Sequence, residues 1–277
     1  MYGSKERIEK GFCWTGKISM LEREVDLNKA KQQIISFIKK KIESSGTDGV
    51  VVGVSGGVDS AVTAYLCVEA LGSKRTLALI MPDMRITPES DIQDAKGVVN
   101  ELGIESKLID IAPIHRSFMR FLERNVVAEG NLRARIRMSM LYYHANALNR
   151  LVVGTGDKSE LLLGYFTKYG DGGVDFLPIG DLYKTEVRKL GEILGISRTI
   201  ISKQSSPRLW AGQTAEAEIG LPYEEIDKIL KAYFEDKLTV KAIIKKLHIE
   251  GSKVQQIIER CEANKHKRLL PDICTVR

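Results

Sequence analysis

The residues with the clearest chemical potential form a short loop, Ser55-Gly56-Gly57-Val58-Asp59-Ser60, which follows an apolar run at Val50–Val54 and precedes an apolar helical pattern. Ligands of parallel α/β sheets bind at the carboxyl ends of strands, and free N–H groups at a helix start favour anions. Glycine lets the backbone approach a phosphate closely, and serine supplies a hydroxyl group. The loop predicts a phosphate site. The simpler alternative is a tight turn in which Asp59 only stabilises the helix start.

An acid inside a phosphate loop repels its ligand unless a cation lies between them. Mg²⁺ binds through one or two carboxylates together with phosphate oxygens, so Asp59 is predicted to be a magnesium ligand. Two further motifs are weaker. Gly11–Ile18 (GFCWTGKI) matches GxxxxGK, but no strand precedes it and Ile18 stands where the metal-binding hydroxyl should be. Gly154–Ser159 (GTGDKS) lacks the third glycine of a dinucleotide-binding fingerprint.

Short apolar runs alternate with helical patterns around this loop, which predicts an α/β fold. We expect a doubly wound, mostly parallel sheet with helices on both faces and a helical C-terminal segment from about residue 222. Residues 1–26 show no periodicity and are interpreted as an N-terminal arm, and residues 27–277 as a single domain. Strands are expected at 50–54, 76–82, 107–111 and 151–155, and helices at 27–42, 58–71, 88–102, from about 113, at 131–149 and throughout 222–264.

The composition is that of a globular protein: of 277 residues, 43% are hydrophobic and 28% charged. No apolar stretch is long enough to cross a bilayer and the N-terminus has no signal-peptide core, so we expect a cytoplasmic protein without a membrane partner. The cysteines form no CxxC pair, which argues against zinc and against a disulfide framework; they are Cys13, Cys67, Cys261 and Cys274. The net charge of +6 fits either nucleic acid or a polyanionic small substrate.

The SGGVDS string resembles the phosphate loop of the N-type ATP pyrophosphatases, the PP-loop superfamily. Within it, the strings GTGDKSE, GYFTKYGDGGVDFLPIGDLYKTEV and the late HKR resemble the ammonia-dependent NAD synthetases, from about Leu27 to Leu270. The resemblance implies a two-step amide synthesis. The nicotinate carboxylate of deamido-NAD attacks the α-phosphate of ATP and pyrophosphate leaves, and ammonia then displaces AMP from the acyl-adenylate. A homodimer with sites near the subunit interface is implied too, as is an external ammonia source.

The resemblance also implies roles for individual residues. Mg²⁺ would be held by Asp59 and Glu160, and Asp171 would take a proton from ammonium in the second step. The implied ATP contacts are Gly53, Val54, Ser55, Gly56, Gly57, Val58, Asp59, Ser60, Thr155, Lys184 and Ser206. The implied deamido-NAD contacts are Arg135, Lys168, Asp175, His266 and Lys267.

Two segments near these residues carry further expectations. Arg133, Arg135 and Arg137 stand at alternate positions of a helical pattern, so we expect them to spread around the helix with most of them on its surface. The segment KQSSPRLWAGQTAEAEIG departs from the family pattern at Gln204, Pro207 and Ala215, so the match at Ser206 is weaker than the match at Thr155.

Two other functions stay open at the level of sequence. One is a different PP-loop adenylase, such as a nucleobase aminase or a tRNA thiolase. A thiolase generally needs catalytic or cluster-binding cysteines, and none lies in the loops assigned to the site. The other is a basic nucleic-acid-binding module. Against it, the basic residues form no long block and only 6% of residues are aromatic, which is little for base stacking. We therefore expect small-molecule substrates and no nucleic acid.

Overall fold

A computed structural model of the chain describes residues 25–276. The predicted arm up to residue 24, the Gly11–Ile18 motif and Cys13 lie outside the described residues. The described chain contains one parallel sheet in the order β3-β2-β1-β4, built from β1 (Gly49–Gly53), β2 (Thr76–Ile80), β3 (Glu105–Leu108) and β4 (Arg150–Val153). The expected parallel α/β sheet is confirmed.

The strand order places a topological switch point beside β1. The chain runs outward from β1 to β2 and β3 and then returns to pair β4 on the other side of β1. Ligands of open α/β sheets bind at such a point, outside the carboxyl ends of the strands. The loop after β1 and the loop after β4 therefore flank one crevice.

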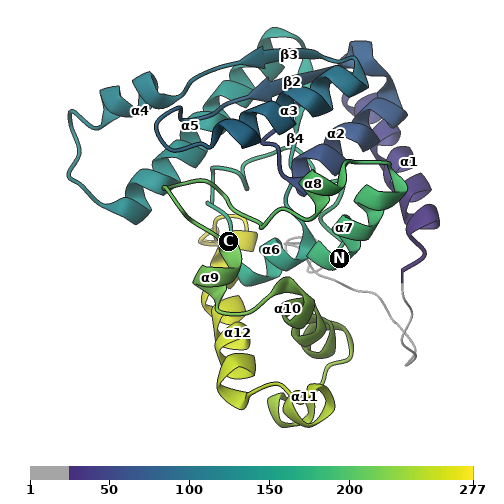
Figure 1. Cartoon of the computed structure of the whole chain (residues 1–277), viewed down its shortest axis with the longest axis vertical. Helices are drawn as coiled ribbons and strands as arrows, with labels where there is room; N and C mark the ends of the chain where they lie inside the picture. Colours follow the sequence, from purple (N-terminus) through teal and green to yellow (C-terminus); the bar gives the residue numbers. More distant parts are fainter. Residues whose placement is uncertain (1–24, 277) are drawn as a thin grey trace.

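Helices cover both faces of the sheet, as expected (Figure 1). Val50 and Val52 of β1 point to one core, which also contains residues of α1 (Leu27–Ser45) and α2 (Val58–Leu71). Val51 points to the opposite core, which contains residues of α5 (Val126–Ala147). Strand side chains alternate between the two faces of a sheet, and both faces of β1 are covered. All of its side chains are therefore directed into a core, which explains why the sequence of β1 is a continuous apolar run.

The C-terminal helices form a further core below the sheet in Figure 1. They pack through α6 (Lys158–Leu163), whose Leu162 and Leu163 belong to this core. The helical segment predicted for 222–264 is confirmed, with short breaks and one π-helical turn: α10 (Tyr223–Leu230), η2 (Lys231–Glu235), α11 (Val240–Leu247) and α12 (Gly251–Ala263). Two unpredicted short helices flank it, α9 (Ala215–Ile219) and η3 (Lys265–Arg268). The single-domain interpretation of residues 27–277 stays a prediction.

Two predicted boundaries were wrong. The strand expected at 107–111 is β3 at Glu105–Leu108, an edge strand whose residues are all exposed. A strand that pairs on one side only and has an exposed face needs no apolar run. The polar residues at the start of β3 therefore gave no hydrophobic pattern that predicts a strand. The helix expected from residue 131 begins at Val126, because the Asn125 side chain caps it by accepting a hydrogen bond from Ala128 N at 3.0 Å.

Two of the remaining helices were expected, α3 (Glu89–Leu102) and α4 (Ala112–Phe118). The structure adds three elements that were not predicted: η1 (Ser73–Arg75), α7 (Lys184–Ile193) and α8 (Arg198–Ile201). Within residues 25–276, no helix combines the length and the apolar character that crossing a membrane requires.

Candidate active site

A cavity of ≈ 430 Å³ opens at the carboxyl edge of the sheet. Its walls come from the phosphate loop, the loop after β4, the glycine-rich loop at 170–173 and the segment of residues 203–214, which we call the strap. The cavity therefore lies at the switch point between β1 and β4, where the strand order places the ligand.

The phosphate loop has the backbone that its glycines predicted. Gly56 has φ +82°, and a Cβ there would lie 2.2 Å from the Asp91 carbonyl oxygen, so no other residue fits. Ser60 Oγ accepts a hydrogen bond from Ser55 N at 3.1 Å, which closes the loop around the start of α2. No described side chain caps that helix start. Its free N–H groups make the loop suitable for an anion.

Lys184 joins this loop to the loop after β4. Its ammonium nitrogen lies 2.6 Å from Asp59 Oδ2, 2.9 Å from Asp157 Oδ2 and 3.0 Å from Glu160 Oε1. Asp157 also caps α6 by accepting a hydrogen bond from Glu160 N at 2.8 Å. The structure thus adds Asp157, which we had not predicted, to the acids near the phosphates. Its place in the string GTGDKSE, directly after a strand end, was the available signal.

The electrostatics of this cluster are set by burial. The Lys184 side chain is fully buried, which would lower its pKa, but the three carboxylates outweigh that effect and its pKa lies well above the usual value. Burial raises the pKa of Asp157 and Glu160 despite the neighbouring ammonium. The three carboxyl groups therefore share one ammonium group, and burial favours the protonated form of two of them.

The donor set fits a magnesium ion that also binds phosphate. Asp59 Oδ1 is buried and has no hydrogen-bond partner among the described residues. Glu160 lines the same cavity. No group of three acidic, histidine or cysteine side chains in residues 25–276 is arranged to hold a metal by itself. Mg²⁺ commonly takes one or two carboxylates and completes its octahedron with phosphate oxygens and water, which two carboxylates beside a phosphate loop allow.

Asp171 lies in the cavity wall, within the glycine-rich loop at 170–173. Its Oδ1 accepts a hydrogen bond from Thr167 N at 2.9 Å, which fixes the carboxyl group within the glycine-rich loop. Burial raises its pKa, although that hydrogen bond and the charges of Arg137 and Lys267 oppose the shift. A carboxylate that lines the cavity and has a raised pKa is suited to accept a proton.

The predicted residues divide between the cavity and its surroundings. Those that line the cavity are Gly53, Val54, Ser55, Gly57, Val58, Asp59, Ser60, Thr155, Glu160, Asp171, Ser206 and Lys267. Lys184 lies behind this wall, against the acids. Within the strap, Ser206 Oγ donates a hydrogen bond to Gln213 O at 2.6 Å.

The other predicted deamido-NAD contacts lie outside the cavity wall. Arg135 Nη2 donates to the Lys168 carbonyl at 3.3 Å, and Lys168 Nζ donates to the His266 carbonyl at 2.9 Å, so these three residues form one exposed cluster. Asp175 accepts hydrogen bonds from Val152 N at 2.7 Å and from the Tyr142 hydroxyl at 3.1 Å. Their binding roles stay predictions.

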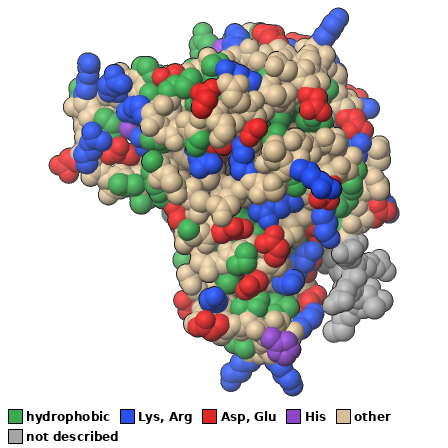
Figure 2. Space-filling view, in the orientation of Figure 1, with side chains coloured by type: hydrophobic (Ala, Val, Ile, Leu, Met, Phe, Trp, Pro, Cys, Tyr) green, Lys and Arg blue, Asp and Glu red, His purple; other side chains and the backbone are tan. Residues whose placement is uncertain are grey.

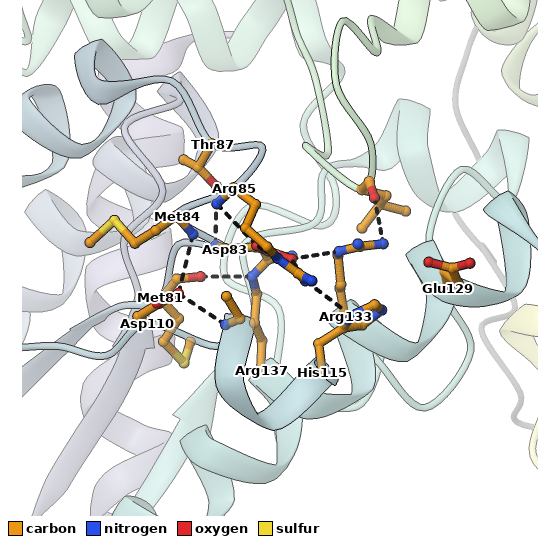
Figure 3. A network of polar contacts seen from close by, with 12 residues as sticks. Met81, Asp83, Met84, Arg85, Thr87, Asp110, His115, Glu129, Arg133 and Arg137 are labelled. Carbon is orange, nitrogen blue, oxygen red and sulfur yellow. Dashed lines mark hydrogen bonds and ion pairs between the residues drawn. The ribbon is translucent and has the colours of Figure 1, made fainter. Parts of the chain in front are cut away.

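Two of the three helix arginines are not on the surface, which corrects the sequence expectation. Arg133 is 7% exposed and pairs with the buried Asp83, and Arg137 Nε donates to the Met81 carbonyl at 2.9 Å (Figure 3). Burial lowers the pKa of Arg137 to about 10. Both arginines turn toward the end of β2 because hydrogen-bond acceptors lie there, the Asp83 carboxylate for Arg133 and the Met81 carbonyl for Arg137. The acid directly after Pro82 was the only signal for this in the sequence.

Together, the parallel sheet, the phosphate loop at its switch point and the paired acids define a nucleotide-binding enzyme of the ATP pyrophosphatase class. The model of the NAD synthase family matches residues 30–271. The chain belongs to the NAD synthase family.

Individual relatives agree with this assignment. An NH(3)-dependent NAD(+) synthetase of Archaeoglobus fulgidus is 52% identical over 91% of this chain and 99% of its own. A solved NH3-dependent NAD synthetase of Campylobacter jejuni is 35% identical with a TM-score of 0.78, over 91% of this chain and 100% of that one. A solved NMN synthetase of Francisella tularensis is 34% identical with a TM-score of 0.80, over 91% of this chain and 99% of that one.

Proposed function

We propose that this chain is an ammonia-dependent NAD synthetase, a ligase that forms the amide of NAD from deamido-NAD, ATP and ammonia. The observation that carries the proposal is the convergence of Asp59, Glu160 and Lys184 beside an uncapped phosphate loop. Curated relatives with this activity cover nine-tenths of the chain at about half identity, which supports the same reaction here.

In the first step, the chain positions ATP and neutralises its charge. The N–H groups at the start of α2 and the hydroxyls of Ser55 and Ser60 bind the phosphates. Asp59 and Glu160 would hold Mg²⁺, which would stabilise the negative charge of the departing pyrophosphate. Lys184 pairs with the same two acids, and its ammonium would add positive charge beside the phosphates.

In the second step, Asp171 prepares the nitrogen nucleophile. Ammonia is mostly protonated near neutral pH and must lose a proton before it attacks the acyl-adenylate. The Asp171 carboxylate in the cavity wall holds the ammonium cation by charge and accepts its proton, and its raised pKa makes it a better base than an unperturbed aspartate. The positive charges of Arg137 and Lys267 favour the ionised form of the Asp171 carboxyl group, so part of the protein carries Asp171 as a carboxylate.

The dinucleotide is proposed to bind across a homodimer interface. Arg135, Lys168 and His266 form an exposed cluster, whereas Lys267 lines the cavity. Because His266 and Lys267 are adjacent in the chain, one bound dinucleotide can contact the cluster and the cavity wall at the same time. Exposed apolar side chains at the end of α4, at the start of α5 and in the segment between them support a subunit contact; they include Phe118, Phe121, Leu122, Val126 and Val127.

Two wider expectations belong to the same proposal. The ammonia comes from an external source, and the reaction takes place in the cytoplasm; the free thiols of Cys67, Cys261 and Cys274 in the described chain suit a reducing compartment. On the face shown in Figure 2, Lys and Arg side chains are interspersed with Asp and Glu, an arrangement that suits a small polyanionic substrate better than a nucleic-acid backbone.

The test is to incubate the pure protein with ATP, Mg²⁺, ammonium and deamido-NAD and to quantify all products. We expect equal amounts of NAD, AMP and pyrophosphate, and no NAD when glutamine replaces ammonium under ammonia scavenging. Deamido-NMN serves as the competing substrate because of the likeness to an NMN synthetase. A higher kcat/KM for deamido-NMN would redirect the proposal to that reaction, and ADP with phosphate as products would refute it.

A further inference from the structure

The strap lines one side of the cavity and is attached to α3, to α5 and to the phosphate loop by polar contacts. Ser206, Arg208, Leu209 and Trp210 line the cavity from this segment. Its attachment to α3 is ionic, since Arg208 Nε lies 2.7 Å from Asp91 Oδ2 and Lys203 Nζ lies 2.9 Å from Asp91 Oδ1. Lys203 also pairs with Asp94 and donates a hydrogen bond to the Gly56 carbonyl of the phosphate loop at 3.1 Å. The strap's attachment to α5 is a single hydrogen bond, from Arg133 Nη1 to the Leu209 carbonyl at 3.1 Å.

Arg133 is held so that it can make this bond. Its Nε donates to Asp83 Oδ2 at 2.9 Å, and Asp83 is fully buried directly after Pro82 at the end of β2. Figure 3 shows the Arg133 guanidinium between Asp83 on one side and the strap carbonyl on the other. Because the acceptor is a backbone carbonyl, Arg133 fixes the position of the strap and not the identity of residue 209.

The Asp83–Arg133 pair stays charged over the ordinary pH range. Burial alone would raise the pKa of Asp83, but hydrogen bonds from Arg85 and Arg133 outweigh it and hold that pKa well below its usual range. Arg85 approaches Asp83 from the same loop, with Nη2 2.6 Å from Oδ2. Asp83 therefore keeps one partner when Arg133 is replaced.

Gly130, one turn before Arg133 on α5, provides the space into which the strap fits. A Cβ built at Gly130 would lie 2.9 Å from Leu209 Cβ and 3.3 Å from Trp210 Cζ3. The first distance is too short for real carbon atoms, so any side chain at position 130 displaces the strap. The φ of Gly130 is not in the left-handed region, so the glycine is required by this close approach and not by backbone strain.

We propose that Arg133 and Gly130 are positioning residues that hold the strap closed over the cavity: Arg133 binds the strap backbone, and Gly130 leaves room for Leu209 and Trp210. Neither residue is assigned to the reacting atoms. In its consequence for ATP, this inference rests on the proposed function. The closed strap retains the nucleotide and excludes water, and the open strap releases it.

The test reads the strap directly through Trp210. The chain has two tryptophans, so Trp14→Phe leaves Trp210 as the only one. In that background, Arg133→Met and Gly130→Ala are compared with Arg116→Met, an exposed arginine on α4, and with Gly97→Ala, a glycine of α3 with open space around it. Acrylamide quenching of Trp210 fluorescence, without any ligand, measures how far the strap opens.

Both strap variants should raise the quenching constant of Trp210, and both controls should leave it unchanged. Loss of one charge-assisted hydrogen bond shifts the closed-to-open ratio by about tenfold or more. We expect the KM for ATP to rise by about the same factor with a smaller change in kcat. If Arg133→Met does not fold, Gly130→Ala decides alone, because it removes no charge.

Two results overturn the proposal. One is unchanged quenching in Gly130→Ala, which would show that position 130 does not seat the strap. The other is increased quenching with an unchanged KM for ATP, which would show that the strap does not retain the nucleotide. If the wild-type protein does not bind ATP at all, the proposed function fails, while the ligand-free quenching still reports on the strap.

Discussion

Replacing Lys184 with methionine tests whether one buried ammonium holds the three acids of the site together. Its nitrogen lies 2.6 to 3.0 Å from Asp59, Asp157 and Glu160. Methionine keeps an apolar stem of similar length and removes the charge. Breaking a buried ion pair from one side costs about 3–5 kcal/mol. At about 2–4 °C per kcal/mol for a domain of this size, Tm should fall by about 6–20 °C.

The loss should depend on pH, and its sign follows from the raised pKa of the acids. Burial already raises the pKa of Asp157 to about 7, and without the ammonium it rises further. A carboxyl group whose pKa is higher in the folded than in the unfolded state contributes stability that is fully present below the unfolded value, about 4 for aspartate, and is lost as pH rises through the folded value. Lys184→Met should therefore lose more Tm near pH 8 than near pH 5.5.

Thermal melts of the wild type, Lys184→Met and Lys41→Met at both pH values check this reasoning. Lys41 is exposed on α1, so its variant controls for the loss of a lysine charge. A Tm loss that is equal at both pH values would refute the electrostatic account. It would show that methionine only disturbs packing against the Tyr223 ring, whose centroid lies 5.3 Å from the Lys184 nitrogen.

Three further predictions concern the reaction. Asp59→Asn should fold with a Tm within a few degrees of wild type, because Asp157 and Glu160 still pair with Lys184. Its rate of pyrophosphate release should fall by orders of magnitude. Normal adenylation by this variant would show that Asp59 only stabilises the start of the helix. Asp171→Asn should still release pyrophosphate from ATP and deamido-NAD but form little NAD. In the wild type, the ammonia step should slow as pH falls through the raised pKa of Asp171, and this dependence should vanish in the variant; equal loss of both products would refute the base role. Lys267→Ala should weaken deamido-NAD binding by about tenfold or more without changing ATP binding. His266→Ala should weaken deamido-NAD binding less, because His266 does not line the cavity. Titration calorimetry with each ligand measures both effects, and unchanged deamido-NAD binding by Lys267→Ala would show that Lys267 is not part of the site.

The strands and helices that depend on burial were predictable from the sequence, and those that depend on neighbours were not. β1 and β2 are buried on both faces, so each appears in the sequence as a continuous apolar run that predicts a strand. β3 is a polar edge strand, and only its pairing with β2 makes it a strand. The early start of α5 depends on the Asn125 cap, which a hydrophobic pattern does not reveal.

The candidate site divides in the same way. Ser55–Ser60 could be recognised because its glycines, hydroxyls and acid stand together in one loop. Asp157 and Arg133 gave only weak signals, because their roles come from partners far away along the chain: Lys184 for Asp157, and Asp83 and the Leu209 carbonyl for Arg133. A single sequence carries the residue types but not these distances.

The central claim is that the carboxylate of deamido-NAD attacks the α-phosphate of ATP, and an oxygen-18 label tests it most directly. Deamido-NAD labelled in the nicotinate carboxylate is converted with unlabelled ATP and ammonium, and the products are separated for mass spectrometry. Because the attacking oxygen stays on phosphorus when ammonia displaces AMP, the account predicts one labelled oxygen in the phosphate of AMP and none in pyrophosphate. Unlabelled AMP, or label in inorganic phosphate released together with ADP, would contradict it.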